Sequence, residues 1–413
     1  MRVNPFPRGA GRPAQYIVGR AAQLNALERL TYEVQKRRRA DSLCFLGPVG
    51  LGKTCLLKHA RSELQKRNWL CGYSEAGPDP ATAFADLLTD AREALPADGI
   101  GARFRSQLQD LSISAGPIGI GLKLDSPGEG TDYSRLSTIL RSLGQLAVKN
   151  GVGVALILDE AQALPRRDLL MFYRVINRLD ELPLAVILAG LPGTPSRVVS
   201  SSRREDSGEF FRENSGEWGI VYDGLGPLSW QNATKSLTLP LADNGSSLTP
   251  EGLHLLLGFA KGHPLTLQML GSAAWLEAEG SVTESRPLAI THDHARAAIR
   301  KVTAQLTVST YRPLWSQLSD GKKAMLRRLA RCELGEMDEY WRSGRPAEYM
   351  DIFADRSLDR EQYGRRRSDL VEPNGKGESV LSALEDLGII YDNRDWARLG
   401  FVIPGFREYI LER

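Results

Sequence analysis

Short, uninterrupted apolar runs recur along the first half of the chain, and they predict the strands of a buried parallel sheet. Runs of this length suit strands covered on both faces, because a half-exposed strand would alternate apolar and polar positions. The runs are Leu43–Leu46, Trp69–Tyr73, Val154–Leu158, Leu184–Leu188 and Gly219–Tyr222. Segments with apolar residues three and four positions apart lie between them, as in helices that pack on a sheet. The pattern therefore predicts an α/β fold.

Beyond residue 226 the apolar periodicity is that of helices only. Ser229 can cap the segment that follows it, and Thr249 precedes a proline at the first helical position. Thr291 marks the start of another helix. We therefore predict three domains: an α/β core over residues 1–228, an all-helical domain over 229–312, and a third domain over 313–413.

Residues 80–150 form an insertion-like stretch within the predicted core. Helical patterns occur near 81–94 and 102–111, and residues 118–124 alternate apolar residues with glycine or lysine, which is typical of a hairpin or edge strand. A helix that carries Leu136, Leu140 and Leu143 on one face then leads into the third predicted strand. Residues 1–15 are rich in proline and glycine and predict an extended strap.

The first apolar run leads directly into the octapeptide Gly47-Pro-Val-Gly-Leu-Gly-Lys53-Thr54, and a helical pattern follows. Strand, G-x-x-x-x-G-K-T loop and helix is the arrangement of a phosphate-binding loop. The glycines let backbone N–H groups turn inward to a phosphate, and the helix N-terminus adds partial positive charge. Lys53 would reach the β- and γ-phosphates, and Thr54 would be a Mg²⁺ ligand. The predicted nucleotide-binding residues here are Gly47, Pro48, Val49, Gly50, Leu51, Gly52, Lys53, Thr54 and Cys55.

The run Val154–Leu158 ends in two acids, Asp159 and Glu160. Ligands of a doubly wound sheet bind at the carboxyl ends of its strands, beside the phosphate loop. We predict that Asp159 holds Mg²⁺ and that Glu160 polarises the attacking water, with Lys53 also catalytic. The two motifs together predict an NTPase that uses ATP or ADP with Mg²⁺.

The composition excludes several classes of function. The formal net charge of +3 over 413 residues does not point to nucleic acid or to a membrane surface. The four cysteines show no paired spacing, which suits a reducing cytosol, and the five histidines are scattered, so no metal site other than the Mg²⁺ site is predicted. No signal peptide pattern and no apolar run of membrane-spanning length is present, and a cytoplasmic location is expected.

These motifs resemble those of the AAA+/STAND superfamily of P-loop ATPases, and more narrowly its prokaryotic origin-recognition-like branch. The resemblance covers most of the chain and implies an ATPase core, a helical lid and a C-terminal winged helix. Val18-Gly19-Arg20 resembles the entry motif that packs near the adenine. Gly262-His263-Pro264 resembles the Gly-x-Pro motif of the STAND lid, whose proline, Pro264 here, closes over the base. Residues 384–391 followed by 399–410 look like the last helices and the hairpin of a winged helix.

The sequence departs from the AAA+ pattern at two places. The fourth strand ends in Ala189-Gly190, where AAA+ proteins carry a polar residue that senses the γ-phosphate. The lid carries His263-Pro264 where many carry a sensing arginine. Both departures argue against a ring-forming motor. They favour a slow ATPase that acts as a switch. Arg212 is the best placed candidate for an arginine finger that acts on a neighbouring copy, and the alternative is a surface salt-bridge residue.

The charge of the C-terminal domain bears on DNA binding. Residues 321–413 carry nearly equal numbers of basic and acidic side chains, and the expected recognition helix, 378–387, holds no lysine or arginine. Packing or docking of a regulatory protein or another copy is therefore an equal alternative to DNA recognition. Three hypotheses remain: an ATP-driven switch, an ATP-dependent DNA-binding initiator or transposition-type helper, and a scaffold that keeps ADP as a structural ligand.

Overall fold

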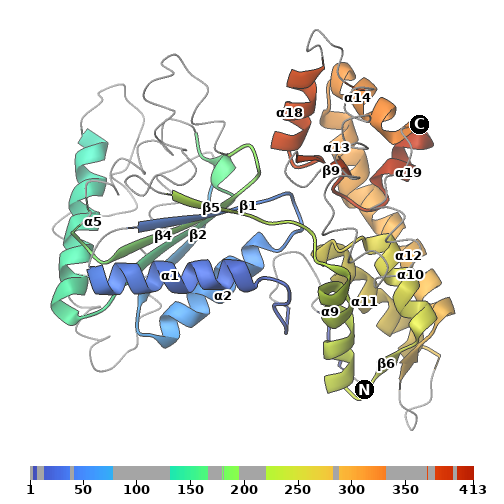
Figure 1. Ribbon diagram of the computed structural model, residues 1–413, viewed down its shortest axis with the longest axis horizontal. Coiled ribbons are helices and arrows are strands. Elements are labelled where there is room, and N and C mark those ends of the chain that lie inside the picture. The colour runs from blue at the N-terminus through green and yellow to red at the C-terminus, as the bar shows by residue number, and fades with distance from the viewer. Residues whose placement is uncertain are drawn as a thin grey trace, which may run out of the picture. The chain divides into compact units, whose positions relative to one another are not determined.

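The computed structural model describes eleven stretches of the chain (Figure 1). They are residues 3–6, 14–37, 41–77, 131–165, 179, 181–194, 220–281, 288–331, 370, 377–393 and 398–413. The chain divides into two units. The sheet unit comprises Arg20–Gly47 and Lys53–Leu225, and the helical unit comprises Met1–Gly19, Pro48–Gly52 and Gly226–Arg413.

A parallel five-stranded sheet, with the order β2-β3-β4-β1-β5, is the centre of the sheet unit in the described residues. The five runs predicted as strands of the parallel sheet are confirmed. The strands are β1 (Asp41–Leu46), β2 (Leu70–Glu75), β3 (Val154–Asp159), β4 (Leu184–Gly190) and β5 (Ile220–Gly224). Every residue of β3 and β4 is buried, which explains why their sequences are continuous apolar runs.

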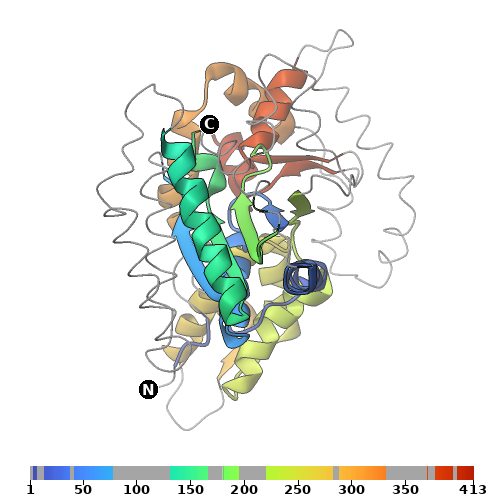
Figure 2. The same ribbon diagram turned by 90° about the vertical axis from the view of Figure 1, so that its left-hand side faces the viewer.

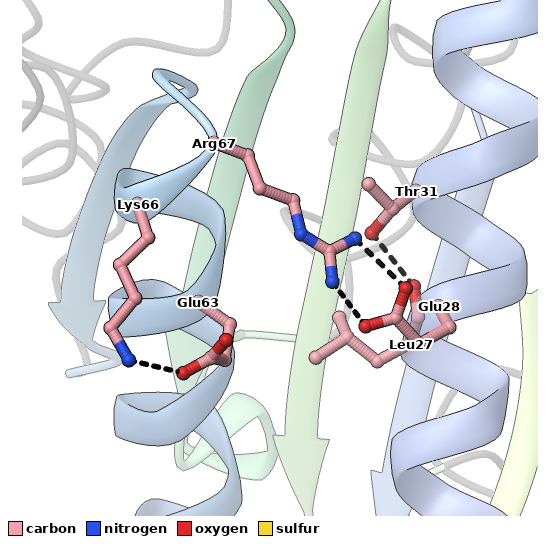
Figure 3. Close-up of polar contacts among 6 residues, drawn as sticks. All are labelled: Leu27, Glu28, Thr31, Glu63, Lys66 and Arg67. Atoms are coloured by element: carbon pink, nitrogen blue, oxygen red, sulfur yellow. Dashed lines mark hydrogen bonds and ion pairs between the residues drawn. The ribbon is translucent and has the colours of Figure 1, made fainter.

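A surface contact of the sheet unit joins helix α1 (Ala21–Arg37) to the turn that follows helix α2 (Lys53–Lys66). The Arg67 guanidinium binds the Glu28 carboxylate through both terminal nitrogens, and Nη1 lies 2.8 Å from Oε2 (Figure 3). On α1 itself, the Thr31 hydroxyl donates to the Leu27 carbonyl at 2.8 Å. Both partners of the ion pair are exposed by a third or more, so the pair adds little stability.

The long helix α5 (Thr131–Asn150), which faces the viewer in Figure 2, leads into β3 as the sequence predicts. The 3₁₀-helix η1 (Ala161–Ala163) follows β3. The helices expected near 81–94 and 102–111 and the hairpin expected at 118–124 lie outside the described residues. No helix among the described residues is both long enough and apolar enough to cross a bilayer.

The helical unit contains the helices predicted beyond residue 226. They are α9 (Trp230–Asp243), α10 (Pro250–Ala260), α11 (Pro264–Glu279) and α12 (His292–Leu306), with the short parallel pair β6 (Ser247–Leu248) and β7 (Ala289–Ile290). Ser229 and Thr249 cap α9 and α10 with their side chains, as predicted.

The N-terminal strap groups with this unit. The amide of Asn4 donates to the Ser272 hydroxyl at 3.0 Å, and the ring of Phe6 occupies the space beside Gly271, where an added Cβ would lie 2.6 Å from it. The strap packs on α11 because Gly271, which has no side chain, leaves room for the phenyl ring of Phe6.

A continuous helical rod connects α12 to the C-terminal region. It is extended by the π-helix η2 (Thr307–Tyr311) and by α13 (Arg312–Gln317). The described elements that follow are α14 (Asp320–Arg331), α18 (Glu378–Asp386), the antiparallel pair β8 (Ile390–Asn393) and β9 (Arg398–Phe401), and α19 (Phe406–Leu411). The predicted helix and hairpin are therefore present. The buried Tyr311 of η2 donates its hydroxyl to the Pro404 carbonyl and packs on the rings of Phe406 and Tyr409.

Candidate active site

The loop between β1 and α2 has a backbone conformation that requires glycine at two positions. Gly50 has a φ of +82° and Gly52 a φ of +96°, values that residues with a Cβ rarely adopt. Helix α2 begins at Lys53, directly after the second of these glycines. The strand, glycine loop and helix of a phosphate-binding loop are therefore present, with a helix N-terminus where phosphate oxygens would bind.

Lys53 lies inside the sheet unit and not on its surface. Its side chain is buried, and Nζ donates to the Gly47 carbonyl at 2.7 Å. Burial lowers the pKa of Lys53, and the Glu160 and Asp159 carboxylates oppose that shift. A buried ammonium with nearby carboxylates is held ready for an anion, because phosphate oxygens would compensate its lost hydration.

Asp159 is fully buried at the end of β3, and its carboxylate accepts three hydrogen bonds. Oδ2 accepts from the Thr54 hydroxyl at 2.6 Å and from the Tyr73 hydroxyl at 3.1 Å, and Oδ1 accepts from the Glu160 backbone N–H at 2.9 Å. Burial first, and then the Asp159 charge, raise the pKa of Tyr73, which keeps this phenol a donor. Thr54 and Asp159, predicted as the Mg²⁺ ligands, are therefore in contact.

The oxygen atoms of Thr54 and Asp159 fit Mg²⁺, which binds hard oxygen ligands and uses few protein side chains beside water and phosphate. Among the described residues, no group of three or more His, Cys, Asp or Glu side chains could hold a metal ion by itself. The site therefore suits a metal ion that arrives with a phosphate ligand and not a cage made of protein side chains.

Glu160 begins the turn after β3 in a left-handed conformation, with a φ of 53°. Its half-buried carboxylate accepts a hydrogen bond from the amide Nε2 of Gln162, which lies on η1. The amide Oε1 of Gln162 accepts in turn from the Leu191 backbone N–H at 3.1 Å, just beyond β4. The predicted catalytic acid is thus fixed by a neighbour of its own turn and by the next strand.

The middle of the phosphate loop, Pro48–Gly52, belongs to the helical unit. The ring of His263, which caps α11, is buried, and its Nε2 lies 3.0 Å from the Val49 carbonyl. The Leu265 backbone N–H donates to the Gly50 carbonyl at 3.1 Å. His263 Nδ1 accepts from the Thr266 N–H at 3.3 Å, so Nε2 carries the proton and donates to Val49.

The structure describes the other residues predicted to contact the nucleotide, but not Arg212. Gly19 has a φ of +67° and lies against Asn232, Val18 is half-buried before it, and Arg20 is buried directly before α1. Pro264 is the first residue of α11. Their contact with an adenine stays a prediction. In the loop, Pro48 and Leu51 are buried and Cys55 is half-buried on the first turn of α2, and Arg212 lies outside the described residues.

Sequence reasoning missed the contacts of two residues, Tyr73 and His263. Tyr73 could have been found, because it lies near the carboxyl end of a predicted parallel strand, where ligand-binding side chains gather. His263 precedes a proline at the first position of a helix, which marks it as an N-cap, but no sequence signal shows that it reaches Val49.

Comparison with known proteins bears on the whole chain. Residues 16–197 match the family described as AAA ATPase domain. A Walker-type ATPase of Pyrococcus abyssi has a similar fold, with 15% identity and a TM-score of 0.55 over 97% of this chain and 98% of that one. The ORC2 protein of Aeropyrum pernix, solved in ADPNP–ADP complexes, has 15% identity and a TM-score of 0.54 over 98% of this chain and 96% of its own. No curated protein matches the sequence.

Proposed function

We propose that the protein is an AAA ATPase with an origin-recognition-like P-loop fold, and that it binds ATP, hydrolyses it slowly and acts as a molecular switch. The reaction is the hydrolysis of ATP to ADP and phosphate. The lid, defined as residues 229–312, and the C-terminal region, 313–413, would change position with the bound nucleotide. This division, with the core over residues 1–228, is part of the proposal.

The chemistry assigned to the site follows from its donors and acceptors. Lys53 would hold β- and γ-phosphate oxygens with the loop amides, and Thr54 and Asp159 would hold Mg²⁺, which offsets phosphate charge when it is bound. Glu160 would orient the attacking water and draw its proton. β4 ends in Ala189 and Gly190, which bring no polar side chain to the site, and this favours a slow reaction.

The observation that carries the proposal is the contact between α11 and the middle of the phosphate loop. The two loop carbonyls that α11 contacts, those of Val49 and Gly50, share peptide groups with the N–H groups of Gly50 and Leu51. Because a peptide group is planar and rigid, turning an N–H toward a phosphate also turns the carbonyl on its other side. Phosphate binding that turns these peptide groups would therefore alter the contact with α11, as a nucleotide-sensing lid requires.

Hydrogen exchange at the Leu265 amide tests the switch directly, since this N–H donates to Gly50. We expect its protection to differ between ADP and a non-hydrolysable ATP analogue, each at saturation with Mg²⁺. The amide of Ala295, which donates to the Thr291 carbonyl at the start of α12, is the matched internal control. Identical protection of Leu265 in both complexes would refute the switch and favour ADP as a structural ligand. Phosphate release by the purified chain measures the turnover itself.

The C-terminal elements are proposed to form a winged-helix-like domain that transmits the state of the lid. Tyr311 continues the helix of the lid and packs into the C-terminal core beside Phe406 and Tyr409, so the two regions are joined by more than a linker. The partner that reads the change would be a second copy of the chain or a regulatory protein. Solution mass with ADP and with the ATP analogue distinguishes these two partners.

One observation favours the alternative, an ATP-dependent DNA-binding initiator or transposition-type helper. Helix α14 buries Met325, Leu326, Leu329 and Ala330 and carries its basic residues on the remaining positions. They are Lys322, Lys323, Arg327, Arg328 and Arg331. Lys323 and Arg327 also lie over the Trp315 ring, which is a structural role for two of them. Binding of duplex DNA that weakens steeply with salt and is lost in Arg331→Glu would support this alternative.

A further inference from the structure

A chain of hydrogen bonds in the sheet unit connects the start of the phosphate loop to the predicted catalytic acid. The Gly47 N–H donates to the Gly190 carbonyl at 3.1 Å. The N–H of the same peptide group, that of Leu191, donates to Gln162 Oε1 at 3.1 Å, and Gln162 Nε2 donates to the Glu160 carboxylate. A single peptide group and a single side-chain amide therefore lie between Gly47 and Glu160.

The surroundings fix that peptide group firmly. An added Cβ on Gly190 would lie 2.3 Å from Thr194 Oγ1, so no side chain fits there without displacing Thr194. The Thr194 hydroxyl and its backbone N–H both donate to the Leu191 carbonyl, at 2.7 and 2.9 Å. The Leu191 N–H is thus held in place and presented to Gln162 by a closed turn.

Gln162 suits a link of this kind because its amide carries a donor and an acceptor at one end. Its acceptor takes the strand N–H and its donor takes the carboxylate, so both ends of the contact are satisfied in one orientation. A glutamate or a methionine of similar length could not make both bonds. The bond to Glu160 also restrains the carboxylate of a residue whose own backbone is left-handed.

We propose that Gln162 is the positioning residue of the hydrolysis reaction, which holds the Glu160 carboxylate in register with the end of β4 and the start of the phosphate loop. This inference rests on the proposed ATP hydrolysis. A shift of Gly47 on phosphate binding would reach Glu160 through the Gly190–Leu191 peptide group and Gln162. The backbone at the end of β4 would thus report the state of the loop without a polar side chain of its own.

Two variants separate the two bonds of Gln162. Gln162→Met removes both, and Gln162→Glu keeps an acceptor for Leu191 and replaces the donor to Glu160 with a second carboxylate. We expect both to lower kcat by roughly ten- to a hundredfold, the range for a misplaced catalytic group, with KM for ATP changed by less than about twofold. The control Gln305→Met changes an exposed glutamine of α12 and should leave both constants unchanged.

Hydrogen exchange at Leu191 gives a second measurement that needs no activity. Exchange should accelerate in Gln162→Met, which lacks the acceptor, and stay slow in Gln162→Glu, which keeps it. Gln162→Asn carries the same amide on a shorter side chain that cannot reach both Leu191 and Glu160. We therefore expect its kcat to be lowered as well. A loss of kcat in Gln162→Glu with Leu191 still protected assigns the effect to the contact with Glu160 and not to the bond with Leu191.

The decisive comparison uses Glu160→Gln as a background. If Gln162 acts through Glu160, adding Gln162→Met to Glu160→Gln lowers the single-turnover rate by less than about twofold, because coupled residues are not additive. Three outcomes would each overturn the inference. They are a kcat of Gln162→Met equal to that of the wild-type chain, additive losses of rate in the double variant, and a rise in KM as large as the loss in kcat. A wild-type chain without hydrolysis, or one that Glu160→Gln does not slow, refutes the proposed function, and Leu191 exchange then still decides whether the link exists.

Discussion

Replacing Gly50 and Gly52 one at a time by alanine tests whether the phosphate loop packs on α11 in solution. The two glycines have similar left-handed φ angles, +82° and +96°. Their surroundings differ. An added Cβ on Gly50 would lie 2.3 Å from Cε1 and 2.7 Å from Nε2 of His263, whereas an added Cβ on Gly52 would meet nothing within 4 Å. Gly52→Ala is therefore a matched control for the backbone effect alone.

The expected magnitudes follow from this difference. A left-handed alanine costs about 1–2 kcal/mol, and the restricted unfolded chain returns about 0.4–1 kcal/mol, so Gly52→Ala should destabilise only slightly. Gly50→Ala adds overpacking against a buried ring, which costs about 1–3 kcal/mol. The free energy of unfolding should therefore fall further in Gly50→Ala than in Gly52→Ala by about 1–3 kcal/mol.

Urea unfolding of the nucleotide-free protein, followed by far-ultraviolet circular dichroism, measures this difference. Only variants with one transition and an unchanged m-value can be compared, since a chain of several domains need not unfold in one step. His263→Ala removes the obstructing ring, so Gly50→Ala should cost less in that background by a similar amount, while Gly52→Ala should cost the same. Equal costs for the two glycines in the wild-type chain would refute the packing of His263 on the loop.

Four further outcomes are expected. Lys53→Ala should weaken ATP binding at least tenfold, or about 1.4 kcal/mol, in calorimetry, because the buried ammonium at the phosphate oxygens is lost. Glu160→Gln should bind ATP normally and hydrolyse it on the order of a hundredfold more slowly, and full turnover would move the catalytic role elsewhere. ADP should slow alkylation of Cys55 in a Cys332→Ser background, while Cys44, whose pKa burial raises to about 12, stays unreactive in both states. Arg67→Ala should change the free energy of unfolding by less than about 1 kcal/mol, and a larger loss would show that this exposed ion pair is not a minor contact.

The elements of the sheet unit could be predicted because each leaves a local signature. The strand ending at Leu46, the glycines of the loop and the helix from Lys53 are contiguous, and the acids after Leu158 end a run that only a buried parallel strand explains. The contact between Thr54 and Asp159 then follows from where parallel strands end.

The remaining features depend on contacts between residues far apart in the chain. Phe6 packs beside Gly271, and nothing in a proline- and glycine-rich segment shows where its single phenyl ring will pack. His263 reaches Val49 across more than two hundred residues. Gln162 was recognisable only as a polar neighbour of Glu160, since its second bond goes to a backbone N–H, and backbone donors have no sequence signature.

The π-helix before Tyr311 sets the rotation of the rod that carries the C-terminal region. A π-turn arises when one extra residue is accommodated in an α-helix, and each helical residue rotates the chain by about 100°. A π-turn spreads one more residue over about the same total rotation, so Tyr311 faces Phe406 and the Pro404 carbonyl although the chain is one residue longer than a regular helix would need. Regular α-helix through the same residues would turn Tyr311, and the last hundred residues with it, by about 100° relative to α12.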